Sequence, residues 1–266
     1  MKKSLKILAL GLAVLPSMLF LASCGKKEED RSIVNTSGKY TAVENSQIGE
    51  INEFLGDKIY ENISGIKNRV LITMTYEDMK VTSEVIATYT NLDKLGTEEF
   101  GMSYIAYQNN KKIGTMYVQN NMLYSSVDKT YTEFNVGSTS DDAVISPTEI
   151  DLSNLFMDYT DTQLTDAQIK VYSKGDTYKI NYINNDDTLD ETLQNVLESM
   201  SATNVTSNPT NMYLVFDQNE FVGMSSEVNL TCNISGYNYK VNAIVETVLF
   251  DGEIEYPDFT GYLPAV

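Results

Sequence analysis

The 266-residue sequence contains no histidine and no tryptophan, and it has only two cysteines. Without histidine there can be no Ser-His-Asp or Cys-His catalysis and no histidine metal site. Carboxylate, lysine or tyrosine chemistry is not excluded by composition. However, no nucleophile motif, phosphate-binding loop or zinc spacing is present. We therefore expect a non-enzymatic protein that needs neither a metal ion nor a cofactor, and an extracellular hydrolase is the least favoured alternative.

The N-terminal region has the order of parts found in a secretory signal. A basic start (Lys2, Lys3 and Lys6) is followed by an apolar run from 7 to 21 and by the tetrapeptide 21–24, Leu-Ala-Ser-Cys. This tetrapeptide resembles the lipobox of bacterial lipoproteins. The resemblance implies cleavage after residue 23 and a diacylglycerol thioether on Cys24. It also implies anchoring at the outer face of the bacterial cytoplasmic membrane, with two acyl chains providing stable attachment.

Two other interpretations of the N-terminal run remain open. A transmembrane helix would need about 20 apolar residues, whereas this run has 15 and contains Pro16, which disfavours a straight helix. An ordinary signal peptide with an incidental cysteine is the second. The small residues directly before Cys24 favour the lipobox.

The second cysteine, Cys232, lies in an alternating stretch. It shares one side with Val222, Met224, Val228 and Leu230 if residues 222–232 are extended. We therefore predict that it is a small buried apolar residue. A reactive thiol is the alternative, but no neighbouring group in the sequence would obviously lower its pKa. If Cys24 carries lipid, no intrachain disulfide is available.

Acidic residues dominate the chain. Removal of residues 1–23 takes away three lysines and no acid, which leaves 16 basic against 37 acidic residues and a net charge of −21. Such a surface repels nucleic acid, because nucleic-acid binding needs basic patches. It also disfavours direct contact between the folded domain and anionic lipid. A basic protein of the cell envelope remains a plausible partner.

Three regions follow from the pattern of the sequence. Residues 1–23 are the signal peptide, residues 24–46 lack periodicity and are predicted to form a lipid-anchored flexible tether, and residues 47–266 form the folded part. Within this part, helical spacing predicts helices at 47–63, 151–158 and 188–200. We favour a single domain over a division near residue 140, and we expect a monomer.

The rest of the folded part alternates as strands do, with turns rich in asparagine, aspartate and glycine. We predict about 11 strands, at 70–76, 79–89, 100–108, 112–119, 121–127, 130–136, 168–173, 177–183, 212–217, 221–232 and 237–250. Local connections between them favour hairpins and a meander. The predicted class is α+β, with one strongly curved antiparallel sheet, an open half-barrel, and helices packed on its concave face.

This order of elements resembles the LolA/LppX-like lipoproteins. The parts that carry the resemblance are the lipobox, the tether, a first helix, a Tyr- and Thr-rich meander, inserted helices and final hairpins that end in Glu-Tyr-Pro-Asp at 255–258. The resemblance covers residues 47–258. It implies a half-barrel with a helical lid over an apolar cavity, and it implies an acyl-chain ligand.

Candidate ligand-binding residues follow from the predicted dry faces of the strands and helices. On the strands they are Met74, Tyr76, Val85, Ala87, Met116, Met212, Met224 and Leu230, and on the lid they are Leu155, Phe156, Leu193 and Leu197. For each of them, a place in an ordinary hydrophobic core is the alternative. The sequence therefore predicts an anchored protein that binds or carries a lipidic ligand. The alternative is an envelope protein–protein interaction module that acts through its acidic surface.

Overall fold

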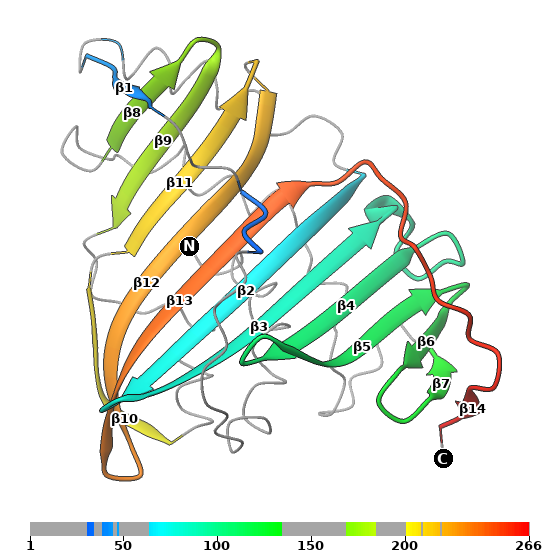
Figure 1. Cartoon of the computed structure of the whole chain (residues 1–266). Helices are drawn as coiled ribbons and strands as arrows, with labels where there is room; N and C mark the ends of the chain where they lie inside the picture. Colours follow the sequence, from blue (N-terminus) through cyan, green and yellow to red (C-terminus); the bar gives the residue numbers. More distant parts are fainter. Residues whose placement is uncertain are drawn as a thin grey trace.

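The computed structural model describes residues 31–34, 39–44, 47, 64–134, 169–184, 201–208, 210–218 and 220–265. These residues form one 14-stranded sheet with two ends, β1 and β14 (Figure 1). The strand order is β1-β8-β9-β11-β12-β13-β2-β3-β4-β5-β6-β7-β14, and β10 pairs with β12 beside this path. All pairs are antiparallel except β14 with β7.

The strand bounds are β1 (Thr41–Ala42), β2 (Gly65–Tyr76), β3 (Met79–Thr90), β4 (Gly101–Gln108), β5 (Lys111–Gln119), β6 (Met122–Ser125), β7 (Thr130–Glu133), β8 (Ile169–Lys174), β9 (Thr177–Asn184), β10 (Ala202–Ser207), β11 (Thr210–Asp217), β12 (Glu220–Ile234), β13 (Tyr237–Leu249) and β14 (Leu263–Pro264). Strands from both halves of the chain share this sheet, because β13 pairs with β2 over ten residue pairs, from Lys240↔Thr75 to Leu249↔Ile66.

Short turns explain why neighbouring strands pair. Asn109 and Asn110 both have positive φ, 47° and 64°, between the paired residues Gln108 and Lys111. A two-residue loop with both φ values positive matches the right-handed twist of the strands that it joins. The Asn109 side chain also accepts a hydrogen bond from the Thr82 amide at 3.0 Å, which ties this turn to β3.

Alternation along the strands gives the sheet two chemically different faces. We call "apolar face" the side that carries Val70 and Ile72 of β2, and "charged face" the side that carries Arg69 and Leu71 of the same strand. The pairing extends both sides across β12, β13, β2, β3 and β4. Since adjacent residues of a strand point to opposite faces, each of these strands contributes to both.

The predicted fold class is wrong in two respects. The sheet has 14 strands rather than about 11, and the described residues contain no α-helix packed on a face; their one helical element with printed bounds is the short 3-10 turn Leu92–Lys94. The structure of the described residues is therefore nearly all β. The helices predicted at 47–63, 151–158 and 188–200 lie outside the described residues, except for Gln47.

The three strands absent from the prediction are β1, β10 and β14. They have two, six and two residues, and their side chains are exposed or half-buried. Such strands bury no face, so no alternation of apolar and polar residues marks them in the sequence. The other eleven strands are present at the expected places, with bounds shifted by a few residues.

Part of the predicted tether contacts the sheet. Within 24–46, the Arg31 guanidinium lies 2.6 Å from Glu84 of β3, and β1 pairs with β8. Val34 is buried, and the Val43 amide donates to the Val171 carbonyl at 2.9 Å. Parts of residues 31–34 and 39–44, within the predicted tether, therefore contact the sheet. The partners lie far away in the sequence, so the local pattern did not indicate them.

Candidate functional site

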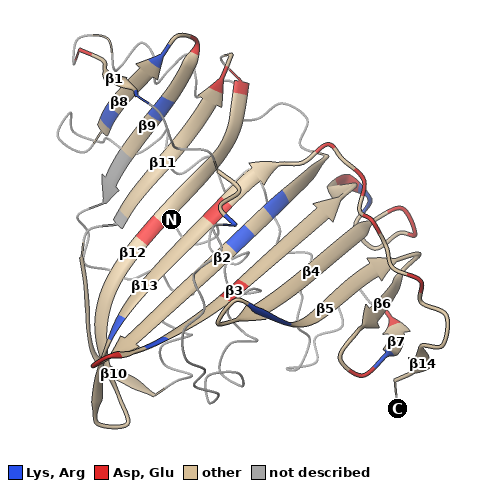
Figure 2. Ribbon diagram, in the orientation of Figure 1, with Lys and Arg blue, Asp and Glu red and all other residues tan. Residues whose placement is uncertain are grey.

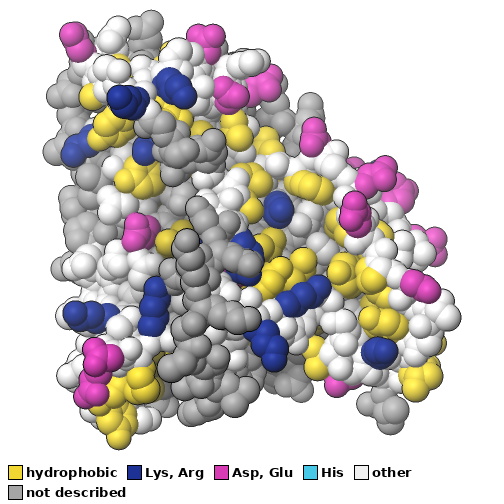
Figure 3. Space-filling view, in the orientation of Figure 1, with side chains coloured by type: hydrophobic (Ala, Val, Ile, Leu, Met, Phe, Trp, Pro, Cys, Tyr) yellow, Lys and Arg dark blue, Asp and Glu magenta, His cyan; other side chains and the backbone are white. Residues whose placement is uncertain are grey.

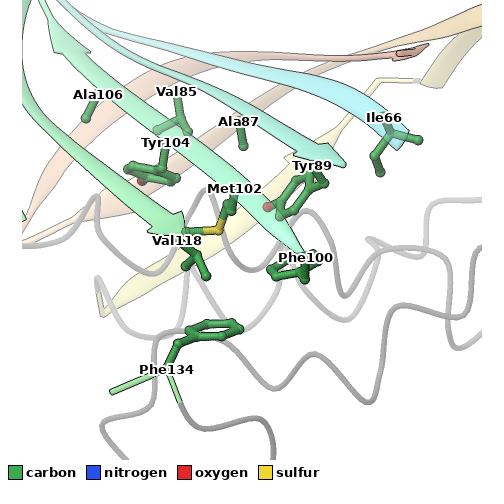
Figure 4. Close-up of a cluster of buried hydrophobic side chains, with 10 residues drawn as sticks. All are labelled: Ile66, Val85, Ala87, Tyr89, Phe100, Met102, Tyr104, Ala106, Val118 and Phe134. Atoms are coloured by element: carbon green, nitrogen blue, oxygen red, sulfur yellow. The ribbon is translucent and has the colours of Figure 1, made fainter. Parts of the chain in front are cut away.

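The apolar face carries two clusters of buried side chains. One spans β2 to β5 and includes Ile66, Met102 and Val118, each 0% exposed (Figure 4). Tyr89, Phe100, Tyr104 and Phe134 add aromatic rings, and Phe100 and Phe134 stack with centroids 5.8 Å apart. Figure 4 shows the members of this cluster on β2, β3, β4 and β5 projecting from the same side of the sheet, with the Phe134 ring lying near Phe100. This half of the face is a buried cluster of mainly apolar side chains.

The second cluster covers β12, β13 and the far half of β2. Its buried members are Val70, Ile72, Met74, Leu230, Cys232, Val241 and Ala243. Burial raises the pKa of the Cys232 thiol, which suppresses its thiolate form. Cys232 is therefore a buried apolar residue with a free thiol, as the alternation of residues 222–232 predicted.

Charge is absent from the apolar face over the described central strands. In β2 this face carries residues 66, 68, 70, 72, 74 and 76, and its register partners in β3, β4, β13 and in 224–234 of β12 are all uncharged. A charge placed there would lose its hydration without gaining a partner. The face can therefore accept an apolar molecule without desolvating any charged side chain of these strands.

The charged face holds a buried ion-pair network at its centre. Arg69 of β2 donates to Glu84 of β3 at 2.6 Å and to Glu246 of β13 at 2.8 Å. All three residues are at most 5% exposed. Burial opposes the charged guanidinium, but the hydrogen bonds to Glu246 and Glu84 outweigh it and raise the pKa of Arg69. Figure 2 shows the charged positions of these adjacent strands side by side.

The N-terminal segment completes this network. Arg31 donates to Glu84 and stacks over the Tyr107 ring at 4.2 Å. The Ser32 hydroxyl donates to Glu246, and the Ile33 amide donates to the same carboxylate at 3.2 Å. Two guanidinium groups thus balance two carboxylates. Residues 31–34 therefore dock on the charged face by neutralising a charge that would otherwise be buried without balance.

The charged face also has an aromatic region at each side. Near β8 to β11, Lys179 lies over the rings of Tyr40, Tyr172 and Tyr213, closest to Tyr213 at 4.6 Å. Near β14, Phe259 of the C-terminal tail stacks on Tyr124 with centroids 3.8 Å apart. Figure 3 views this face and shows basic side chains over its middle and its β8–β9 side. Both ends of the described chain are therefore held against the same face.

The structure brings eight of the twelve predicted ligand-binding residues together. By strand register they all lie on the apolar face: Met74, Tyr76, Val85, Ala87, Met116, Met212, Met224 and Leu230. Tyr76 is at its margin, where it contacts Tyr237 and Tyr239. The lid candidates Leu155, Phe156, Leu193 and Leu197 and the anchor Cys24 lie outside the described residues. Ligand binding by any of them stays a prediction.

Sequence reasoning missed the ion-pair network. Arg69 stands before the apolar run Val-Leu-Ile at 70–72, and Glu84 and Glu246 stand in the middle of two other long alternating segments. A charge in the interior of each of these three alternating segments was the available signal. It did not reveal which charges meet, because Glu246 is 177 residues from Arg69.

Comparisons with known proteins detect similarity in structure only. No protein-family model matches the sequence, and no curated protein matches it significantly. The chain is similar to the crystal structure of lipoprotein LppX from Mycobacterium tuberculosis, with 8% identity, 78% of this chain and 98% of that chain covered, and a TM-score of 0.31. It is also similar to a LolA superfamily protein from Nitrosomonas europaea, with 9% identity, 77% and 94% covered, and a TM-score of 0.25.

Both matches are to proteins of the kind that the order of elements resembles, and at this level the likeness concerns the fold alone.

Within the described ranges, no three or more acidic or cysteine side chains gather where they could hold a metal ion. Within those same ranges, none of the helical segments has the length and apolar character of a membrane span.

Proposed function

We propose that this chain is an extracytoplasmic lipoprotein, anchored through Cys24, that binds a hydrophobic ligand on the apolar face of its sheet. The observation that carries the proposal is the segregation of charge: the central strands place every charged residue of their paired segments on the opposite face. An apolar ligand gains about 25 cal/mol for each Å² of its surface that leaves water. The uncharged side chains of this face impose no desolvation cost for charge.

The anchor is supported by the tetrapeptide at 21–24 and by the apolar run before it. In a bacterium that processes lipoproteins, Cys24→Ser should give an unprocessed precursor or release the protein into the medium. Membrane fractionation and the intact mass of the N-terminal peptide measure this. A Cys24→Ser protein that is still cleaved and still fractionates with membranes would refute the anchor.

Ligand binding is tested on the anchored protein in nanodiscs. A photoactivatable diacyl lipid should crosslink to residues of the apolar face, such as Val85, Met102 and Leu230, and organic extraction of freshly purified protein should yield an apolar molecule. Residue-level mapping of the crosslinks gives the internal control, because Ile86, Ser103 and Thr231 are their neighbours on the other face. Crosslinks absent from the apolar face, together with an empty extract, would rule out this function.

A second function, recognition of a basic envelope protein, is supported by an exposed acidic region. Glu98 and Glu99 precede β4, and Asp251, Glu253 and Glu255 follow β13; all five are exposed. Figure 2 shows acidic residues along this edge of the molecule. Substitution of the five by their amides should weaken binding to a defined basic envelope protein and remove its salt dependence. Binding that is unchanged in the substituted protein would exclude this region.

A further inference from the structure

One row of the apolar face differs from the rows beside it. Register places Thr247, Asn68, Ala87, Tyr104 and Met116 in line across β13, β2, β3, β4 and β5. Thr247, Asn68 and Tyr104 make this row polar. At the same strands the flanking rows carry Val70, Val85 and Ala106 on one side and Ile66, Tyr89 and Met102 on the other, where the Tyr89 hydroxyl is the one polar side-chain group.

Two atoms of this row have no hydrogen-bond partner among the described residues: the Asn68 Oδ1 and the Tyr104 hydroxyl. Their residues are 6% and 4% exposed. Ala87 lies between them, and its methyl group cannot form a hydrogen bond. Adjacent strands are about 4.8 Å apart, so the Asn68 and Tyr104 backbones are separated by two such steps. The arrangement thus leaves both groups unsatisfied within the sheet itself.

An unsatisfied buried polar group costs about 1–3 kcal/mol, so two of them in one row require an explanation. Burial raises the pKa of Tyr104 to about 12, and the hydroxyl therefore keeps its proton as a donor. The Asn68 amide can present either its oxygen or its nitrogen, because the two exchange by rotation. The row therefore offers a donor and an adaptable amide inside an uncharged, apolar surface.

We propose that Asn68 and Tyr104 bind the polar linkage of a neutral acylglycerol, whose acyl chains lie on the flanking apolar rows. This rests on the proposed ligand-binding function and specifies its ligand class. The Tyr104 hydroxyl donates to an ester carbonyl, and the Asn68 amide pairs with a glycerol hydroxyl. A lipid phosphate is disfavoured, because the described central strands provide no cation on this face to offset its desolvation.

Two substitutions separate a binding role from a structural role. Tyr104→Phe and Asn68→Leu each remove an unpartnered polar atom and keep most of the side-chain volume. We expect the ligand-free Tyr104→Phe protein to unfold at equal or higher urea concentration, because the Tyr104 hydroxyl has no hydrogen-bond partner to lose. The same substitutions should weaken acylglycerol binding by about 3- to 10-fold each, since each removes one hydrogen bond to the ligand. Tyr107→Phe is the matched control, because Tyr107 is on the same strand but the charged face.

The binding experiment uses the anchored protein in nanodiscs with a photoactivatable diacylglycerol, and competition by dioctanoylglycerol, dioctanoyl phosphatidic acid or hexadecane. Dioctanoylglycerol should compete at least tenfold better than phosphatidic acid, and this preference should fall in Tyr104→Phe and Asn68→Leu but not in Tyr107→Phe.

Equal competition by the neutral and the anionic lipid, unaffected by the substitutions, would overturn the acylglycerol assignment and leave the proposed ligand binding intact. Destabilisation of the ligand-free protein by Tyr104→Phe would also overturn it, because the hydroxyl would then have a structural partner such as a buried water. No crosslink on the apolar face with any probe would remove the proposed function and this assignment together.

Discussion

The two faces of the central strands are built from alternate residues of the same segments, yet they follow opposite rules. On the apolar face of β2, Val70 and Ile72 are buried among other uncharged side chains. On the charged face, Arg69 is equally buried but is held by two carboxylates. Burial alone therefore does not distinguish the faces. What distinguishes them is how each satisfies its buried groups: by exclusion of charge on one side, and by charge balance on the other.

The largest expected effect comes from breaking the charge balance. Arg69→Leu leaves Glu84 and Glu246 buried with one cation fewer, and it should lower the free energy of unfolding by about 3–5 kcal/mol. Urea unfolding measures the loss. Lys67→Leu, on the same strand and face but half-buried, should change stability little. Addition of Glu84→Gln and Glu246→Gln to Arg69→Leu should restore part of the loss; a triple variant less stable than the single one would contradict this account.

The next effect tests packing on the apolar face. Met102→Ala removes a side chain that is 0% exposed and leaves a cavity, at a cost of about 2–4 kcal/mol. Ile105→Ala, on the same strand but half-buried on the other face, should cost clearly less. Thermal unfolding of both proteins gives the comparison. Equal losses would mean that the fully buried Met102 contributes no more packing energy than the half-buried Ile105, contrary to this expectation.

Alkaline pH should affect the apolar face through Tyr104. Its folded-state pKa of about 12 is above the ordinary value of 10 for tyrosine. The stability that this shift contributes is fully present below pH 10 and is lost as the pH rises from 10 to 12, because the unfolded chain then releases the proton first. Tyr104→Phe should remove this loss, worth about 2 kcal/mol. The free energies of unfolding of the wild-type and Tyr104→Phe proteins at pH 9, 10 and 11.5 test this prediction. The same pH dependence in both proteins would contradict it.

The smallest effect concerns the N-terminal segment. Arg31→Ala removes one of four charges, at a position whose side chain is 15% exposed, and should lower stability by about 1–2 kcal/mol. Hydrogen exchange should accelerate at the Ile33 amide, which donates to Glu246. Lys39→Ala, in the same N-terminal region, is the control. Unchanged protection of Ile33 would show that residues 31–34 do not depend on the ion pair.

Much of this arrangement was predictable from local sequence. Alternation placed Met74, Val85 and Leu230 on one side of their strands, because a strand that buries one face repeats every two residues. The asparagine pair at 109–110 identified a hairpin for a similar local reason.

What local sequence could not provide is the meeting of distant segments. The pairing of β13 with β2 sets Glu246 beside Arg69, and no local pattern encodes that choice of neighbour. The docking of Arg31 is also long-range, because its partner Glu84 is 53 residues away in the sequence. Asn68 was missed because the predicted strand began at Val70, two residues after it. Tyr104 was missed because a polar residue within an alternating strand is ordinarily assigned to the solvent-exposed face, whereas both residues lie on the apolar face.

The pairing of β13 with β2 also has a consequence for biogenesis. The meander from β2 to β7 is made of neighbours in the chain, but the outer edge of β2 is occupied by residues 240–249. During synthesis, that edge stays open while residues 77–239, more than half of the polypeptide, emerge. An unpaired edge is a template for pairing with other chains. The nascent protein must therefore pass through a stage in which its centre is the part most exposed to aggregation.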